Sequence, residues 1–143
     1  MTPSVTFADN GTYTVSLRIT DNHNATAVDS AIVTTTNISP TVEAGPNITV
    51  IVEGFVNLAN ATFTDPGSAD SHTASVDWGD GTIDEPIVYD GTIYAYHSYA
   101  SEGDYTTEIC VTDDDGGVGC DTFTVTVTVE SIEYLIFLPV TTR

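Results

Sequence analysis

Residues 76–82 read Val76-Asp77-Trp78-Gly79-Asp80-Gly81-Thr82, and this stretch decides the fold. Side chains alternate between the two faces of a strand, so Val76 and Trp78 lie on one face of an extended segment. Gly79 and Gly81 bracket a single Asp, as expected where the backbone takes a positive φ just past a strand end. We therefore predict a short strand that ends in a tight turn, with the only Trp of the chain at the centre of an all-β core.

The region around this stretch offers seven short apolar segments separated by turns that contain Gly, Asp, Pro and Asn. They are residues 47–52, 55–63, 73–78, 82–89, 91–99, 104–112 and 120–129. Short strands with such turns are typical of a Greek-key sandwich, and no segment has the 3.6-residue apolar period of a helix. We therefore predict an all-β, Ig-like, seven-stranded Greek-key β-sandwich over residues 38–130.

Residues 7–38 and 99–130 form an internal repeat with a constant offset of 92 positions and no gaps. Gly11-Thr12-Tyr13 lies over Gly103-Asp104-Tyr105, and Ile19-Thr20-Asp21 lies over Val111-Thr112-Asp113. A repeat of this kind determines the domain organisation. It predicts the back half of one module in residues 1–37, a complete module in 38–130 and a tail in 131–143.

The front fragment, residues 1–37, is predicted to be a two-stranded half-module. Tyr13, Val15, Leu17 and Ile19 alternate with polar residues, and a second strand is expected over about residues 28–36. Two strands alone are marginal in water and cannot bury this apolar face. Either the first half of the module is missing from this chain, or another chain or the C-terminal tail supplies strands.

The connecting and terminal segments have distinct compositions. Residues 38–44 are predicted to be a semi-stiff linker, because Pro40 and Pro46 discourage continuous strand pairing. The tail, residues 131–143, contains the consecutive apolar residues 134–138, which indicate a strand buried on both faces and are too few to span a membrane. No targeting peptide is visible at the start, so we expect the natural start to lie upstream.

The chain contains far more acidic than basic residues. The chain has 21 Asp and Glu residues against Arg18 and Arg143, with no Lys, and a formal net charge of −19. Nucleic acid and anionic membranes would be repelled, so both are excluded as partners. Cations are compatible with this charge, above all Ca²⁺, which binds carboxylate and carbonyl oxygens. The alternative is a solvated acidic surface that keeps a secreted protein soluble.

Cys110 and Cys120 flank a turn that contains three consecutive Asp residues. If Thr112 lies opposite Val118 across this turn, the two Cys residues lie directly opposite each other on the outward face. We therefore predict a cross-strand Cys110–Cys120 disulfide in an extracellular protein. A metal-binding or redox pair is the alternative, and the sequence lacks a second Cys or His cluster to support it.

The stretch at residues 76–82 resembles the WDFGDG signature of PKD domains. The downstream segments 97–99, 103–105 and 111–113 are similar to that family's later pattern, including Tyr105. The resemblance implies an extracellular, usually non-catalytic β-sandwich. It also implies that residues 1–37 are the C-terminal half of a preceding PKD repeat, and that Asp80 organises its own turn.

Acidic loops are predicted to meet at one end of the sandwich. In this topology the loop of residues 65–72 and the turn of residues 113–116 share one end, beside the entering linker. PKD-like modules of bacterial collagenases bind calcium near this end through linker and loop oxygens. The calcium ligands expected here are Ser39, Asp65, Asp70, Asp113, Asp114 and Asp115. Asp also favours turns without any metal, which is the alternative explanation.

Catalysis is not expected. The three His residues, 23, 72 and 97, are scattered, and we expect His97 to pack or hydrogen-bond beneath the turn. No Ser/His/Asp or Cys/His order supports a nucleophile, and seven short strands leave little chain for the cleft that a glycosidase pair needs. The sequence therefore predicts no enzyme and no cofactor other than Ca²⁺.

Five of the seven Asn residues begin an Asn-x-Ser/Thr triplet, the acceptor pattern for N-glycosylation. They are Asn10, Asn24, Asn37, Asn47 and Asn60. The alternative is turn-forming Asn beside strand-forming Thr.

Three functions remain open. The first is a structural or adhesive module of an extracellular or cell-surface protein, in tandem with PKD-like repeats. The second is a subunit of an extracellular filament that exchanges strands with copies of itself. The third is an accessory domain of a secreted hydrolase that binds glycan or protein through Tyr89, Tyr94 and Tyr96.

Overall fold

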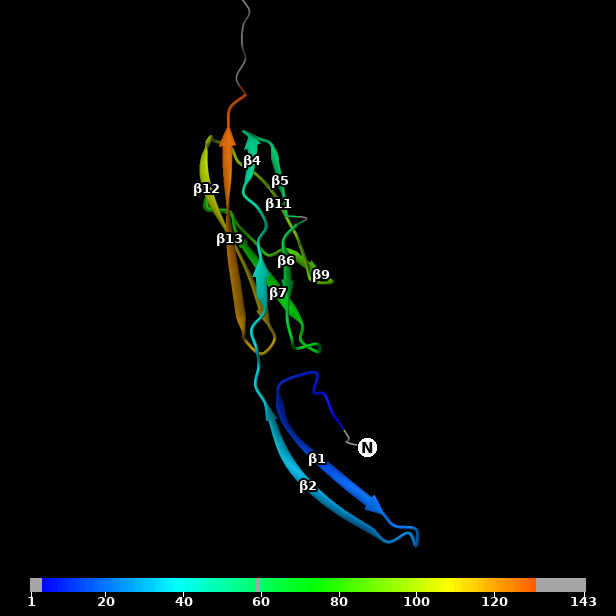
Figure 1. Cartoon of the computed structure of the whole chain (residues 1–143). Helices are drawn as coiled ribbons and strands as arrows, with labels where there is room; N and C mark the ends of the chain where they lie inside the picture. Colours follow the sequence, from blue (N-terminus) through cyan, green and yellow to red (C-terminus); the bar gives the residue numbers. More distant parts are fainter. Residues whose placement is uncertain (1–3, 59, 131–143) are drawn as a thin grey trace, which may run out of the picture.

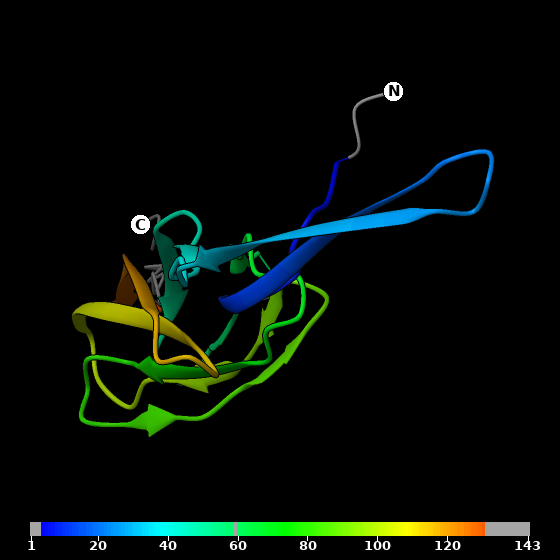
Figure 2. The same ribbon diagram turned by 90° about the horizontal axis from the view of Figure 1, so that it is seen from below.

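The structure, a computed structural model, describes residues 4–58 and 60–130 of the 143-residue chain. Every regular element in this part is a β-strand, and no helix long and apolar enough to cross a bilayer occurs there. A hairpin of β1 (Gly11–Thr20) and β2 (Thr26–Thr35) extends from one end of a β-sandwich (Figures 1 and 2). The apolar tail that the sequence predicts as a possible strand lies outside the described residues.

The sandwich confirms the predicted all-β class and Ig-like architecture. One sheet has five strands in the order β4-β13-β12-β7-β8, and the facing layer consists of β3-β6-β10-β9 and the pair β11-β5 (Figure 1). The strands are β3 (Thr41–Glu43), β4 (Ile48–Ile51), β5 (Phe55–Asn57), β6 (Thr62–Thr64), β7 (His72–Asp77), β8 (Ile83–Asp84), β9 (Ile87–Tyr89), β10 (Thr92–Tyr94), β11 (Tyr96–Ser98), β12 (Gly103–Asp113) and β13 (Val118–Thr128).

The prediction of seven continuous strands is wrong in detail, because three of them are each divided in two. The predicted strand 82–89 is interrupted at Pro86, which has no backbone N–H for a ladder. The predicted strand 55–63 turns where Ala61 N donates to Leu58 O at 2.8 Å. Residues 41–43, predicted as linker, form β3, which pairs with β6 because Val42 points into the core.

The Trp78 side chain is fully buried at the centre of the sandwich, as predicted. Its indole N–H donates to Asp84 Oδ2 at 2.8 Å, and its backbone carbonyl accepts a bond of 2.9 Å from the buried hydroxyl of Tyr99. The His97 ring stacks on the indole with centroids 4.8 Å apart. Buried Trp and Tyr need partners for their polar atoms, and this network supplies them.

The turn after Trp78 requires its glycine. Gly79 has a φ of 77°, and a Cβ there would lie 2.5 Å from the carbonyl oxygen of Thr106. Asp80 Oδ1 accepts from the N–H of Thr82 at 3.0 Å, and its Oδ2 lies 2.8 Å from His97 Nε2. Burial raises the pKa of Asp80, but these hydrogen bonds outweigh it and hold the pKa below its usual range. The geometry agrees with the turn-organising role that the resemblance implies for Asp80.

The β12–β13 hairpin contains the predicted disulfide. Thr112 pairs with Val118, and Cys110 pairs with Cys120 directly opposite. The Sγ atoms of these residues are bonded, with Cα atoms 4.1 Å apart. The register inferred from the sequence is therefore confirmed.

Candidate functional site

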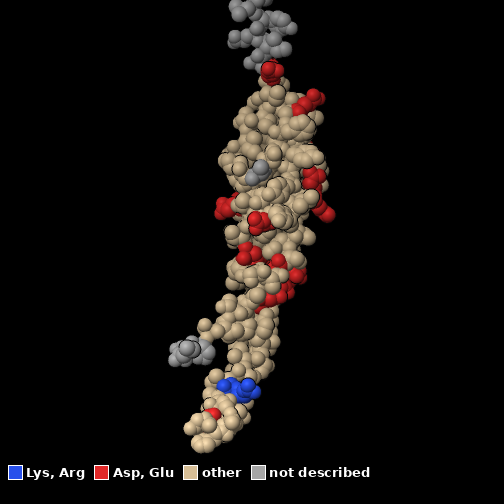
Figure 3. All heavy atoms as spheres, turned by 90° about the vertical axis from the view of Figure 1, so that its right-hand side faces the viewer, with Lys and Arg blue, Asp and Glu red and all other residues tan. Residues whose placement is uncertain are grey.

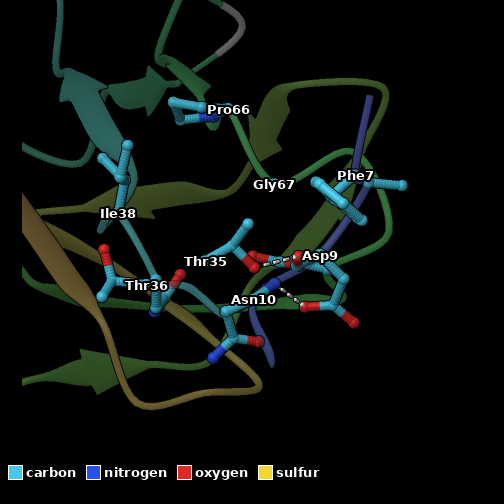
Figure 4. Close-up of a pocket in the computed structure, with 11 residues that line it drawn as sticks. Phe7, Asp9, Asn10, Thr35, Thr36, Ile38, Pro66 and Gly67 are labelled. Carbon is cyan, nitrogen blue, oxygen red and sulfur yellow. Dashed lines mark hydrogen bonds between the residues drawn. The ribbon is translucent and has the colours of Figure 1, made fainter. Parts of the chain in front are cut away.

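The acidic residues meet where the β1–β2 hairpin joins the sandwich, a region called here the junction. It consists of the base of the hairpin (residues 7–10 and 35–40), the β6–β7 loop (65–71) and the β12–β13 turn (113–117). Figure 4 shows a hollow of about 170 Å³ between the hairpin base and the β6–β7 loop. Asp9, Asn10 and Thr35 lie on its hairpin side, and Pro66 and Gly67 lie on its sandwich side.

Direct hydrogen bonds hold the junction together. Asn37 Nδ2 donates to Asp113 Oδ2 at 2.8 Å, and the backbone N–H of Ala69 donates to the carbonyl of Ala8 at 3.1 Å. Gly117 allows this approach, because a Cβ there would contact Asp113 Oδ2 and lie 2.9 Å from Asn37 Nδ2. The hairpin base is thus bonded to two separate loops of the sandwich.

Asp113 organises the β12–β13 turn. It is 5% exposed, and its Oδ1 accepts from the backbone N–H groups of Gly117 at 2.6 Å and Asp115 at 3.1 Å. The hydrogen bond from Asn37, aided by those from the turn, holds the pKa of Asp113 below its usual range against the opposing effect of burial. Asp113 is therefore an ionised carboxylate that accepts hydrogen bonds both from its own turn and from Asn37 at the base of the hairpin.

Asp65 is a second buried carboxylate with its own partners. Its side chain is only 3% exposed, and its Oδ2 lies 3.0 Å from His72 Nε2. Oδ1 accepts from Gly67 N at 2.7 Å, and the His72 ring packs against Phe63 with centroids 4.8 Å apart. These contacts fix the start of the β6–β7 loop beside β7.

Asp70 differs from Asp65 and Asp113 in its hydrogen bonding. Its Oδ1 is buried and has no hydrogen-bond partner in the part of the chain that the structure describes. Burial is the largest cause that raises the pKa of Asp70 above its ordinary value, and the neighbouring carboxylates of Asp65 and Asp9 add to it. Ionised Asp70 is therefore destabilised where it lies.

Two groups of carboxylates could hold a metal ion, and Asp70 belongs to both. One is Asp65, Asp70 and Asp113, and the other is Asp9, Asp70 and Asp115; within each group one oxygen per residue lies within 4.8 Å of the others. Four of the six predicted ligands thus come together. Carboxylate oxygens at this spacing suit a hard cation such as Ca²⁺.

The other two predicted ligands are placed differently. Asp114 is in neither group, and its Oδ1 accepts from Ser71 N at 3.0 Å. Ser39 Oγ lies 2.8 Å from the position of a Cβ on Gly117, at the edge of the junction. Asp9 was missed by the sequence analysis. No local pattern marked it, because Asp9 reaches the junction only through the pairing of β1 with β2, which returns the chain to the sandwich.

The charge on the surface is unevenly distributed. Acidic side chains gather on the sandwich and at the junction, whereas the hairpin is nearly free of them (Figure 3). Residues 11–36 contain Asp21 and Asp29 against Arg18, the only Lys or Arg of the described ranges. At the junction the carboxylates repel one another, and Asp65 and Asp9 contribute to the raised pKa of Asp70.

The candidate binding tyrosines lie on the outer face of the sandwich layer opposite the five-stranded sheet. Tyr94 and Tyr96 line a hollow of about 380 Å³ together with Asp84 and Glu85. Tyr89, Tyr94 and Tyr96 are 73%, 51% and 74% exposed, respectively, so their rings are accessible to a ligand. Tyr89 is not among the residues that line this hollow.

The five Asn-x-Ser/Thr sites differ in exposure. Asn24, Asn47 and Asn60 are exposed, whereas Asn10 and Asn37 are half-buried. The Nδ2 atom of Asn37 is already a donor to Asp113. This nitrogen is the atom to which a sugar would be attached, so Asn37 is the least accessible acceptor of the five.

The sandwich matches a known protein family. The sequence profile of the PKD domain matches residues 37–129, more than half of the chain. A comparison with curated protein sequences found no match.

Solved structures include three informative neighbours. The PKD domain of an M14-like peptidase from a Thermoplasmatales archaeon is 25% identical, with a TM-score of 0.48, over 65% of this chain and 99% of that one. A human PKD domain is 21% identical, with a TM-score of 0.45, over 69% and 90%. The fibronectin(III)-like modules of Clostridium thermocellum CbhA are 17% identical, with a TM-score of 0.51, over 87% and 68%. The last likeness shows a shared β-sandwich fold.

Proposed function

This chain belongs to the PKD domain family, and we propose that it is a non-catalytic structural module of an extracellular or cell-surface protein. In this proposal it acts as a spacer or adhesive stalk, in tandem with PKD-like repeats. The observation that carries the proposal is the junction, where the hairpin base is hydrogen-bonded to the sandwich through Asn37 and Ala8. A joint with such contacts sets the direction of one module relative to the next.

The polar groups support a structural role. Around Trp78, the carboxylates of Asp77, Asp80 and Asp84 each accept a hydrogen bond from the turn, the indole or both, and His97 is engaged with Asp80. Groups used in this way stabilise the turn and the core around Trp78. The Cys110–Cys120 disulfide supports an oxidising, extracellular location.

The junction also fits the calcium ion that the family resemblance implies. The fit rests on the buried, unpartnered Oδ1 of Asp70 and on a donor set made only of carboxylates. The residues that would hold the ion are Asp65, Asp70 and Asp113, with Asp115 from the β12–β13 turn and Asp9 from the hairpin base. Ca²⁺ would neutralise their repulsion and link the hairpin base to both sandwich loops.

Calorimetric titration of the full chain with CaCl₂ tests the metal proposal. We expect binding that weakens in Asp9→Asn and Asp115→Asn. It should be unchanged in Glu102→Gln, a matched control in the residue before β12, at the opposite end of that strand from the junction. Equal affinity in all four proteins, or no binding in the parent, would refute the calcium site.

The spacer role is tested by the distance between the two ends of the molecule. His23→Cys at the hairpin tip and Glu53→Cys at the β4–β5 turn can be labelled with a fluorophore pair, since the described residues contain no free Cys. A stiff spacer gives one narrow distribution of energy-transfer distances. A broad distribution that reaches short distances would overturn the role, because it would show a freely swinging hairpin.

A second candidate function is self-assembly through the hairpin. Leu17 and Ile19 are 58% and 63% exposed, and Ile32 is 75% exposed. β1 and β2 pair through ten residues without a bulge, and their outer edges make no ladder within the described residues. Open edges of this kind invite pairing with another chain. Light scattering across a wide range of protein concentration tests this function, and a constant monomer mass would rule it out.

A third candidate, glycan or protein binding, rests on the hollow beside Tyr94 and Tyr96. Exposed aromatic rings beside carboxylates suit a neutral, hydroxyl-rich ligand, since a net charge of −19 disfavours anionic ones. Retention on a panel of insoluble glycans and collagen should be lost in Tyr94→Ala/Tyr96→Ala. It should be kept in Tyr13→Ala, which changes a ring at the hairpin base.

A further inference from the structure

The β1–β2 hairpin reproduces β12–β13 in structure as well as in sequence. Gly11 pairs with Thr35 as Gly103 pairs with Val127, so the two hairpins share one register at the offset of 92. Tyr13 OH donates to Asp9 O at 3.0 Å, and Tyr105 OH donates to Ser101 O at 3.1 Å. The hairpin therefore has the backbone geometry of a strand pair from inside a sandwich.

The turns of the two hairpins also correspond. Asp21 Oδ1 accepts from the N–H groups of His23 and Ala25, both at 2.8 Å. Asp113 makes the same two bonds in the β12–β13 turn. Asn24 takes the left-handed conformation, with a φ of 63°, at the position where Gly116 has a φ of 86°.

The hairpins differ in what covers them. In the sandwich, Ile109 and Val111 are fully buried, because β7 pairs antiparallel with β12 and the facing layer closes over them. On its other side, β13 pairs parallel with β4. The equivalent residues of β1, Leu17 and Ile19, are 58% and 63% exposed. The same surface is thus covered in one copy and uncovered in the other.

We propose that the apolar face and both edges of the β1–β2 hairpin form a docking surface for a PKD front half of the type of residues 38–98. A β7-like strand of this partner pairs antiparallel with residues 16–21, and a β4-like strand pairs parallel with residues 33–36. These registers are those of β7 and β4 shifted by 92 positions. The inference rests on the proposed function, because it names the neighbouring module that the spacer continues.

The segment before β1 resembles the segment before β12. Phe7 stacks on Tyr13 with centroids 4.4 Å apart, as Tyr99 stacks on Tyr105 at 4.3 Å. In the sandwich, Tyr99 directly follows β11 of the front half. The hairpin therefore repeats the aromatic contact that forms beside a front half in the sandwich.

A second copy of the hairpin is a poorer occupant. Two hairpins packed face to face would cover the apolar side chains but leave the outer edges of β1 and β2 unpaired. A front half satisfies both requirements, because it supplies edge partners and a facing layer together. It also buries the equivalents of Thr107 and Ile109, which are fully buried in the sandwich.

The test is to supply the front half. Residues 38–98 are joined directly to Phe7 of the chain, which restores the spacing of the repeat, and amide hydrogen exchange is measured in this fusion and in the parent protein. We expect the amides of residues 15–19 to exchange many-fold more slowly in the fusion. A matched fusion with the copied Trp78→Asp should exchange like the parent. Equal exchange in fusion and parent would overturn the proposal.

Disulfide trapping tests the register independently. Cys110 pairs with Ser75, so Arg18 should pair with the copied Ser75 in the fusion. We expect Arg18→Cys to crosslink with the copied Ser75→Cys and not with the copied Thr73→Cys. Crosslinking at Thr73 or at neither position would contradict the proposed pairing. These results are separate from the distance between the hairpin tip and the β4–β5 turn, so the spacer role and this inference can fail independently.

Discussion

Asn37 donates a hydrogen bond of 2.8 Å from its side-chain amide to Oδ2 of Asp113, and this bond joins the base of the hairpin to the β12–β13 turn. It connects two residues 76 positions apart and ends on a carboxylate whose pKa it helps to lower. The orientation of the hairpin and the ionisation of the acidic junction are therefore coupled.

Asn37→Ala should make the protein more sensitive to acid. A carboxyl group with a lowered folded-state pKa stabilises the fold above its unfolded pKa of about 3.9, and this stability is lost as the pH falls through the folded-state value. Without Asn37 the pKa of Asp113 rises, so the acid-unfolding midpoint measured by circular dichroism should shift to higher pH. Asn22→Ala, at an exposed position of the hairpin tip, is the control, and an identical midpoint for Asn37→Ala would contradict the coupling.

Asp70→Asn should have opposite effects with and without calcium. The raised pKa of Asp70 means that its ionised form destabilises the folded state above that pKa, and that this cost is relieved as the pH falls through it. In EDTA at neutral pH, the variant should therefore melt at a higher temperature than the parent. With CaCl₂ it should lack the increase in Tm that the parent shows. A lower Tm in EDTA would mean that Asp70 has a stabilising partner.

Tyr99→Phe should destabilise the sandwich without changing its volume. The hydroxyl donates to Trp78 O at 2.9 Å and lies 3.2 Å from Thr107 Oγ1, and both partners are buried. Leaving such groups unsatisfied costs about 1–3 kcal/mol, which urea unfolding can measure. Tyr96→Phe, at a site 74% exposed, should change the free energy of unfolding by less than about 0.5 kcal/mol. Equal effects of both changes would refute the role of the buried bond.

The disulfide of the sandwich should be transferable to the hairpin. Arg18 and Val28 are directly opposed, as Cys110 and Cys120 are. The double variant Arg18→Cys/Val28→Cys should oxidise to one additional disulfide, seen by mass spectrometry, and make opening of the hairpin harder by about 2–3 kcal/mol. Two reactive thiols in the folded protein would show that the register differs in solution.

Glycosylation should follow exposure when the chain is secreted from cells that modify Asn. We expect sugar on Asn24, Asn47 and Asn60, which are exposed, and none on Asn37, whose Nδ2 donates a hydrogen bond to Asp113. Glycopeptide mass spectrometry gives the occupancy of each site. Full occupancy of Asn37 would mean that the junction forms differently or after modification.

Local patterns in the sequence predicted much of the fold. The turn after Trp78 and the pairing of Cys110 with Cys120 follow from alternation and glycine placement, which depend on near neighbours only. The division of the long strands did not follow, because it depends on contacts such as Leu58 with Ala95 that join distant segments. β3 was not predicted either, because it forms through pairing with β6, a strand distant in the sequence.

The acidic site was predicted in outline because its two loops lie at one end of any sandwich with this strand order. Asp9 was not, since it comes from the base of the β1–β2 hairpin and only the packing at the junction brings it to Asp70. The unpartnered oxygen of Asp70 was equally invisible, because burial is a property of the folded molecule.

The central claim is that the hairpin continues the long direction of the sandwich through a bonded, acidic junction. Small-angle X-ray scattering of the dilute full chain with CaCl₂ tests this most directly. We expect an elongated particle whose scattering matches a hairpin extending beyond the sandwich, as in Figure 1. A compact particle with the hairpin folded back on the sandwich would contradict it.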